Sequence, residues 1–106
     1  MYLEKLTEKE REFLDFKKIE GSKDISINSY YKVFLNFKDV IGELDISNFN
    51  SLCQKVLEYF KYVSVNNGNT TFNNKRKHLN GYFNYLVDRE LLQDNPSYTL
   101  FNTNIR

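Results

Sequence analysis

Apolar side chains recur every three or four residues along most of this chain, and this spacing constrains the fold more than any other feature. The clearest stretch contains Phe49, Leu52, Cys53, Val56, Phe60 and Val63. Residues at this spacing lie on one side of an α-helix, so the pattern predicts amphipathic helices. One proline and four glycines are too few for the frequent tight turns of a β-sheet protein. The sequence therefore predicts an all-α fold.

Residues that favour helix ends divide the chain into four predicted helices, which would pack as a single compact bundle. Thr7 and Glu10 match a capping box, in which each side chain binds a backbone amide at a helix start. The first helix is predicted to run from this box to Gly21, because glycine commonly follows a helix end. The second is predicted to run from near Ser26 to Gly42 for the same reason.

The last two predicted helices are separated by the stretch VNNGNTT, residues 65–71, whose composition favours a turn. The third helix is predicted to begin after Asp45 or Ser47. The fourth is predicted to begin at a threonine N-cap, Thr71, and to end near Arg89. The sequence DNP at 94–96 then closes the domain, because a residue before proline avoids the helical conformation.

The length of 106 residues predicts one domain rather than two. We predict an N-terminal extension at 1–6, the folded domain at 7–96, and at 97–106 a tail or the start of a linker. No run of about 18 apolar residues is present, and the first residues are charged where a signal peptide would be apolar. These features predict a cytoplasmic protein with no membrane partner.

The single cysteine, Cys53, lies on the apolar stripe of the third predicted helix and is predicted to be a buried, reduced thiol. One cysteine and one histidine supply too few ligands for a zinc site. The sequence therefore predicts no metal and no cofactor.

The excess positive charge lies in residues 70–89, which hold Lys75, Arg76, Lys77 and Arg89 against one acidic residue, Asp88. On the fourth predicted helix the core stripe is Phe72, Leu79, Phe83 and Leu86. A second side carries an amide and ammonium stripe of Asn73, Lys77, Asn80 and Asn84, extended by Asn74, His78, Gly81 and Tyr85. The second helix has a similar polar strip of Asn28, Ser29, Lys32 and Asn36. Charge of this kind indicates an anionic partner, most commonly nucleic acid.

The polar stripe also has simpler interpretations. Every amphipathic helix has a solvated side, and the fourteen asparagines of the chain fit the composition of an AT-rich genome. Gly81 either permits close approach by a ligand or faces a neighbouring helix. From the residues alone, DNA binding and a solvated surface both remain open.

Two ordered segments resemble the N-terminal core-binding, SAM-like domain of tyrosine recombinases, the phage-integrase family. FLDFKKIEGSKDISINSYYKVFLNF is similar to the first helix, loop and T-x-x-x-Y-x-x-x-L-x-x-F second helix of that domain. TTFNNKRKHLNGYFNYLVDRELLQDNP resembles its helix with a basic front and an FF-x-YL rear, followed by a gli-x-x-NP exit. The resemblance covers about residues 7–96.

The resemblance implies a DNA-binding module with no catalytic residues, and so not an enzyme by itself. In that family the second and fourth helices hold one face of the duplex while a C-terminal domain grips the other. The implied partners are double-stranded DNA, the catalytic domain of the same parent protein, and other recombinase protomers on the DNA. Carried over by position, the contact residues are Asn28, Ser29 and Lys32, together with Asn73, Asn74, Lys75, Lys77, Asn80 and Asn84.

The chain departs from the family pattern in three ways. Arg76 stands where relatives usually have an apolar residue, and Asn80 stands where many have a basic one. No segment resembles the catalytic domain with its nucleophilic tyrosine, so we expect this chain to be part of a longer recombinase.

Two other classes of function are alternatives to DNA binding. In a helical protein-interaction module, the aromatic residues off the core stripes would form a docking patch, namely Tyr62, Tyr82 and Tyr85. A small stand-alone enzyme lacks support, because no phosphate-binding loop and no paired carboxylates near a histidine are present.

Overall fold

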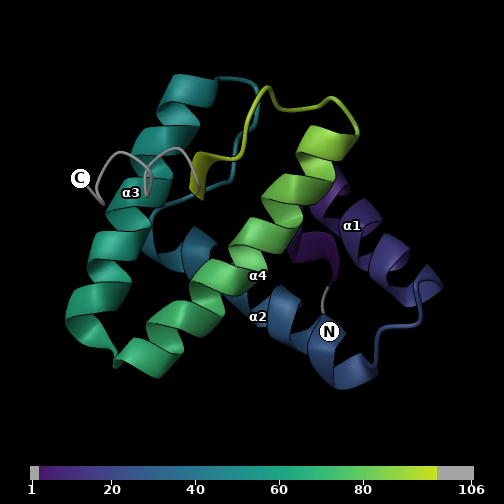
Figure 1. Ribbon diagram of the computed structural model, residues 1–106, viewed down its shortest axis with the longest axis horizontal. Coiled ribbons are helices and arrows are strands. Elements are labelled where there is room, and N and C mark those ends of the chain that lie inside the picture. Colours follow the sequence, from purple (N-terminus) through teal and green to yellow (C-terminus); the bar gives the residue numbers. More distant parts are fainter. Residues whose placement is uncertain (1–2, 98–106) are drawn as a thin grey trace.

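The computed structural model describes residues 3–97, and four α-helices make up most of that range (Figure 1). They are α1 (Glu8–Ile19), α2 (Asp24–Val40), α3 (Phe49–Asn66) and α4 (Asn69–Asp88), preceded by a short 3-10 helix, η1 (Leu3–Lys5). No strand occurs among these residues. The prediction of an all-α bundle with four main helices is confirmed.

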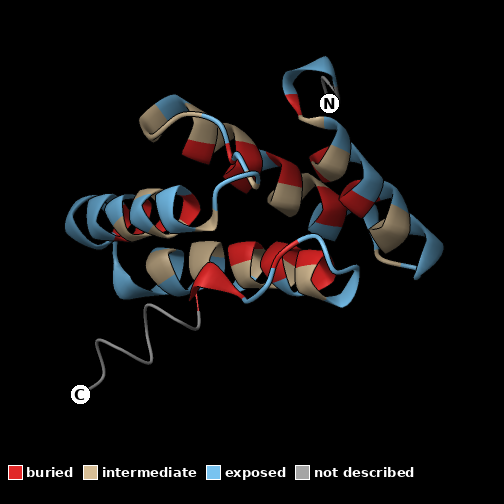
Figure 2. Ribbon diagram, turned by 90° about the horizontal axis from the view of Figure 1, so that it is seen from above, coloured by how far each residue is buried: buried red, intermediate tan, exposed pale blue. Residues whose placement is uncertain are grey.

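The fourth helix is central to the packing. α4 contacts each of the other three helices, and α1 also packs on α2. In Figure 1, α4 runs obliquely across the molecule between α3 and α1 and in front of α2. Figure 2 shows that buried residues gather where the helices face one another, while the outward sides are exposed. The buried residues of α4 all lie in its C-terminal half, between Leu79 and Leu86, so its N-terminal half contributes most of its exposed surface.

The predicted start of the first helix is confirmed. The Glu10 backbone amide donates to Thr7 Oγ1 at 3.3 Å, and the Thr7 amide donates to Glu10 Oε1 at 2.9 Å. α1 ends at Ile19, and Gly21 follows with a φ of +93°, a conformation that favours glycine. Gly42 has a φ of +125° just past α2, so both glycine stop signals were identified correctly.

The starts of α2 and α4 differ from the prediction. α2 begins at Asp24, two residues before Ser26. α4 begins at Asn69, and Gly68 occupies the N-cap position with no side-chain hydrogen bond. Thr71, the predicted N-cap, lies in the first turn of the helix. Glycine is acceptable at an N-cap, so a threonine three positions further on does not have to serve as one.

The start of α3 was also predicted a little early. Its N-cap is Asn48, whose Oδ1 accepts a hydrogen bond from the Ser51 amide at 3.0 Å. Asp45 instead closes a turn before the helix, accepting from the Ser47 amide at 2.9 Å and from its hydroxyl at 2.7 Å. This hydrogen bonding holds the pKa of Asp45 below its usual range. The hydrogen-bonding groups of Asp45 and Ser47 pair with each other, and the helix starts after them.

An aromatic cluster joins α1, α2 and α4, with Phe13 at its centre. The Phe13 ring lies 5.0 Å from Tyr30, 6.1 Å from Phe34, 5.3 Å from Tyr82 and 5.1 Å from Tyr85, measured between centroids. All four contacts are edge-on, a favourable arrangement for aromatic rings. Tyr82 and Tyr85 therefore belong to the core.

This burial corrects two predictions made from the helical wheel. Tyr85 was placed on the polar surface of the fourth helix, and Tyr82 and Tyr85 were placed in an exposed docking patch. Tyr82 is fully buried and Tyr85 is 7% exposed. α4 packs against three helices, so its apolar arc is wider than the single stripe that the wheel assumed. Only Tyr62 of the proposed patch is exposed.

A buried ion pair links α1 to α2. Lys38 Nζ lies 3.2 Å from Glu10 Oε1, and the Glu10 side chain is completely buried. Burial raises the pKa of the Glu10 carboxyl, while the Thr7 backbone and Lys38 act to lower it. Glu10 thus caps α1 and also ties it to α2.

Membrane-spanning and metal-binding features are absent from the described residues, 3–97. No helix there combines the length and apolar character needed to cross a membrane. No cluster of three or more metal-ligating side chains occurs there. Cys53 was predicted to be buried but is only half-buried, and burial raises the pKa of its thiol. Of the predicted extension, Leu6 packs in the core, and of the predicted tail, Ser97 is buried and 98–106 lie outside the described residues.

Candidate nucleic-acid interface

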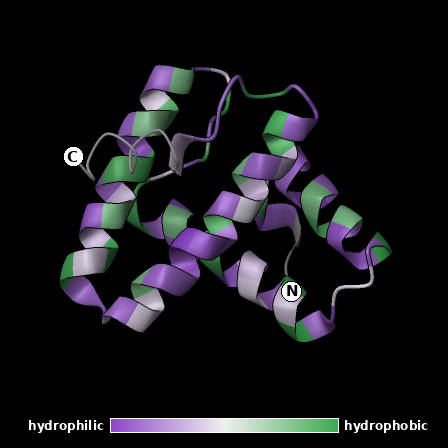
Figure 3. Cartoon of the chain, in the orientation of Figure 1, coloured by the Kyte–Doolittle hydropathy of each residue, from purple (hydrophilic) through white to green (hydrophobic). Residues whose placement is uncertain are grey.

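Two hollows flank the N-terminal half of α4, where Figure 3 shows hydrophilic residues along the helix. The first, the α2–α4 groove, has a volume of about 230 Å³ and is lined by Ser29, Lys32, Val33, Thr71, Asn74, Lys75 and His78. The second, the α4 hollow, has a volume of about 330 Å³ and is lined by Asn73, Asn74, Arg76, Lys77 and Asn80. Asn74 lies on the ridge between them.

The lining of these two hollows is basic and amide-rich. Of the described residues that line them, none is acidic, and Lys32, Lys75, Arg76 and Lys77 are cationic. By contrast, a hollow between α1 and α4 is lined by Glu12 and Asp15 as well as Arg89. Fields from like charges add within a concave surface. The α2–α4 groove and the α4 hollow therefore fit an anionic partner.

The structure brings most of the predicted contact residues together. Ser29 and Lys32 of α2 meet Asn74 and Lys75 of α4 in the α2–α4 groove. Asn73, Lys77 and Asn80 lie along the α4 hollow. Asn28 is half-buried on α2 and Asn84 is exposed further along α4, and neither lines these two hollows.

Lys75 has a structural role that its sequence position does not reveal. Its Nζ donates to Asn36 Oδ1 at 3.3 Å, and the same oxygen accepts a hydrogen bond from the Tyr59 hydroxyl. Burial lowers the pKa of Lys75 and raises that of Tyr59. Lys75 thus connects α4 to α2 and α3. Lys32 and Lys77 are the exposed cations of the surface.

His78 occupies a defined place in the α2–α4 groove. Its Nδ1 lies 2.6 Å from the Asn74 carbonyl oxygen, and its ring packs edge-on against Tyr30 at 4.7 Å. A carbonyl oxygen only accepts hydrogen bonds, so Nδ1 carries a proton. Nε2 then accepts a hydrogen bond from a ligand when the ring is neutral and donates one when it is charged.

Gly81 faces a neighbouring helix, the second of the two predicted interpretations. A Cβ atom at this position would lie 3.2 Å from the hydroxyl oxygen of Tyr30 on α2. The glycine therefore permits close packing of α2 and α4 and does not extend the polar surface.

Asn80 and Asn84 take part in a contact that sequence reasoning missed. The Asn95 side-chain nitrogen donates to Asn80 Oδ1 at 2.7 Å and to Asn84 Oδ1 at 2.8 Å. Asn95 itself is 2% exposed. The sequence did contain a hint of this contact, namely two asparagines four residues apart followed by an asparagine before a proline. The DNP sequence, however, was interpreted only as the point where the chain leaves the helical bundle. The asparagines of α4 thus serve the fold as well as the surface.

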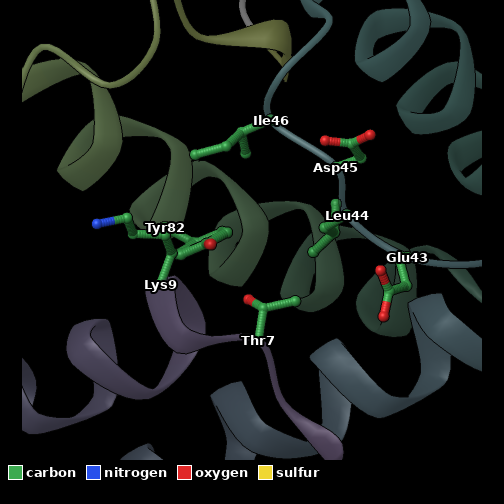
Figure 4. Close-up of a pocket in the computed structure, with 7 residues that line it drawn as sticks. All are labelled: Thr7, Lys9, Glu43, Leu44, Asp45, Ile46 and Tyr82. Atoms are coloured by element: carbon green, nitrogen blue, oxygen red, sulfur yellow. The ribbon is translucent and has the colours of Figure 1, made fainter.

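A separate pocket of about 190 Å³ lies between the start of α1, the α2–α3 connection and α4 (Figure 4). Figure 4 shows the amine of Lys9 and the carboxylate of Asp45 pointing out to opposite sides of it, with Tyr82 between α1 and α4. Burial and the nearby Glu10 raise the pKa of Tyr82, so this phenol stays neutral. The pocket is small and lacks the converging charges of the two hollows on α4.

Known proteins give no independent indication of what this surface binds. No family model, no curated protein and no solved structure matches the chain. The resemblance of residues 7–96 to the core-binding domain of tyrosine recombinases therefore stays a prediction.

Proposed function

We propose that residues 7–96 form the core-binding module of a site-specific tyrosine recombinase of the integrase type. The module holds one face of duplex DNA through α2 and α4, and a catalytic domain of the same parent protein carries out integration or recombination. The observation that supports this proposal best is the α2–α4 groove, where Ser29 and Lys32 meet Asn74 and Lys75 in a surface with cationic and amide lining. Those two helices are the ones that the family resemblance assigns to DNA.

The size of α4 suits a major groove. The helix has 20 residues, which corresponds to about 30 Å of length. A major groove about 12 Å wide admits one α-helix. The ridge carrying Asn73, Asn74 and Lys77 would enter it, with α2 lying against the adjoining backbone. Lysine contacts to phosphate would position the module, and asparagines would contact base edges.

The three lysines of the two hollows contribute to the proposed DNA binding in different ways. Lys32 and Lys77 are exposed on separate helices, so each can neutralise a phosphate without disturbing the core. Lys75, by contrast, already donates a hydrogen bond to Asn36. Substituting Lys75 would therefore change packing and charge together. A clean test of phosphate binding uses Lys32 and Lys77.

The experiment is a fluorescence-anisotropy titration of labelled duplex DNA at about 50 and 200 mM salt, a range over which phosphate contacts lose affinity steeply. Wild type is compared with Lys32→Gln/Lys77→Gln, and with the charge-matched control Lys18→Gln/Lys61→Gln on α1 and α3. We expect wild-type binding in the non-specific range of about 10⁻⁴ to 10⁻⁶ M. The test variant should lose affinity and reduce the salt slope by up to about 1.8, because each lost contact contributes about 0.9.

Equal losses in the test and control variants would mean that general charge, and not α2 and α4, attracts the DNA. No binding by wild type at low salt would overturn the proposal. In that case a protein partner at exposed apolar residues of α3, such as Tyr62 and Val65, becomes the next hypothesis, with binding that is insensitive to salt.

A further inference from the structure

Three asparagine side chains meet beside the C-terminal half of α4. The Asn95 nitrogen, Nδ2, lies 2.7 Å from Asn80 Oδ1, 2.8 Å from Asn84 Oδ1 and 3.3 Å from the Asn80 backbone oxygen. Asn95 comes from the segment after α4, eleven residues beyond Asn84 in the chain. We call this arrangement the asparagine clasp. It joins the segment that follows α4 to α4 itself, the helix that carries most of the candidate interface.

The orientation of the Asn95 amide is fixed from its other side. The Ser97 backbone amide donates to Asn95 Oδ1 at 2.9 Å, and a backbone amide can only donate. The oxygen of Asn95 therefore faces Ser97, and its nitrogen faces α4. Ser97 and Asn95 are both 2% exposed, so a reversed amide would leave buried polar groups unpaired.

The Asn95 orientation determines those of Asn80 and Asn84. A primary amide nitrogen has two hydrogens to donate and accepts none. Both atoms that face it must therefore be oxygens. The nitrogen of each amide lies on the opposite branch of the same planar group, so it is turned away from Asn95. Asn84 is exposed, and its Nδ2 is thereby turned toward the surface.

We propose that Asn95 is a positioning residue that makes Asn84 a hydrogen-bond donor on the exposed side of α4, beyond the two hollows, and holds Asn80 with its oxygen inward. Its consequence for recognition rests on the proposed function. Asparagine reads adenine with both branches of its amide, accepting from N6 and donating to N7. The Asn84 oxygen faces Asn95 and already accepts from it, so the nitrogen is the branch turned outward and the two-pronged contact is disfavoured. Asn84 donates instead to an acceptor, either a phosphate oxygen or the N7, O6 or O4 atom of a base edge.

The first test uses the free wild-type protein, so it does not depend on DNA binding. Side-chain amide exchange is measured for Asn84 and Asn95 by ¹⁵N NMR. The Asn95 amide protons should exchange about tenfold more slowly than those of Asn84, because a buried hydrogen bond contributes about 1.4 kcal/mol. Slow exchange at Asn84 and fast exchange at Asn95 would overturn the proposal.

The second test reverses the direction of the hydrogen bond between residue 95 and Asn84 without changing the net charge of the protein. Asp94→Asn/Asn95→Asp exchanges two neighbouring residues and keeps the net charge, and Asp94→Asn alone is its control. A carboxylate at position 95 accepts only, so Asn84 must turn its nitrogen inward. Its amide protons should then become slow to exchange in the double variant and stay fast in the control. Unchanged fast exchange at Asn84 in a folded double variant would overturn the proposal.

A titration with duplex DNA then links the clasp to recognition. Duplex should shift the Asn84 amide resonances in wild type and in the control but not in the double variant. If wild type binds duplex with no shift at Asn84, the recognition role is overturned. If wild type does not bind duplex, the proposed function fails, while the exchange measurements still decide the orientation of the amides.

Discussion

The Tyr30 side chain lies directly over the backbone of Gly81, with its hydroxyl oxygen 3.2 Å and its Cε1 atom 3.6 Å from the place of a Cβ atom. The Tyr30 ring is held by edge-on contacts with Phe13 at 5.0 Å and His78 at 4.7 Å. It therefore has little freedom to move. This contact sets how closely α2 and α4 approach, and so it shapes the groove between them.

We expect Gly81→Ala to gain less stability than an alanine normally gives. Alanine is favoured over glycine within a helix by about 1 kcal/mol. The new Cβ would press on the Tyr30 hydroxyl, which offsets that gain. In a Tyr30→Phe background the close oxygen is absent, so Gly81→Ala should recover the full gain of about 1 kcal/mol. Urea unfolding of the four proteins of this cycle measures the difference; equal effects of Gly81→Ala in both backgrounds would contradict the contact.

The stability of the protein should depend on pH through Glu10. Burial raises the pKa of Glu10, so the folded state holds its proton more readily than the unfolded state. The contribution of Glu10 is then fully present below its unfolded pKa of about 4.3 and is lost as pH rises through the raised folded pKa. Relative to Glu10→Gln, wild type should lose unfolding free energy on going from pH 4 to neutral pH, as measured by urea unfolding at a series of pH values.

Lys38→Met removes the other partner of the same ion pair and should lower the free energy of unfolding. The variant keeps the aliphatic stem but leaves a buried carboxylate without the ammonium 3.2 Å away. Breaking a buried pair in this way costs about 3 kcal/mol. Lys18→Met, at an exposed position of α1, serves as the control and should stay within about 0.5 kcal/mol of wild type. Similar stabilities for the two variants would show that the pair contributes little.

Asn36 should matter more to stability than Lys75. Its oxygen accepts from both the Tyr59 hydroxyl and Lys75 Nζ, and Tyr59 is fully buried. Asn36→Leu leaves that hydroxyl without its acceptor and should cost about 2 kcal/mol. Lys75→Met keeps the stem and removes a partly buried charge, so it should stay within about 0.5 kcal/mol of wild type. Thermal unfolding measures both, and the opposite order would contradict this assignment.

The observed cap of α3 gives a further prediction. Asn48→Ala removes the acceptor for the Ser51 amide and should cost about 1 kcal/mol. Thr71→Ala, at the position that was predicted to cap α4, should change the unfolding free energy by less than about 0.5 kcal/mol because Gly68 is the cap. A large loss from Thr71→Ala would restore the original assignment of that helix start.

Apolar spacing and the residues that favour helix ends together predicted four helices, because each helix needs one continuous side toward the core and a defined start and stop. Helix starts were predicted less well, since Asp45, Ser47 and Asn48 are all good N-caps and local sequence does not choose among them. Thr7 was identified because Glu10 completes its capping box. The width of the buried side of each helix depends on how many other helices pack against it. The spacing of apolar residues in the sequence does not reveal that number.

The candidate interface was predicted from side-chain type, helical position and the family resemblance. These locate Lys32 and Lys77 on the surface correctly. They do not show that Lys75 pairs with Asn36 or that Asn84 pairs with Asn95, because each contact joins the helix to another segment, 39 and 11 residues away in the chain. Polar residues that bind one another across helices resemble a ligand-binding stripe when the sequence is considered one helix at a time.

The contacts of Phe13 also make α1 suitable as one half of a split-protein reporter. Gly21 and Lys23, in the short connection after α1, are exposed, and the chain could be divided there. The two fragments would recognise each other through one ring surrounded by four others and through the Glu10–Lys38 pair. A fragment carrying α1 should then restore the fold of the remainder in trans, and Phe13→Ala in that fragment should abolish the reassembly.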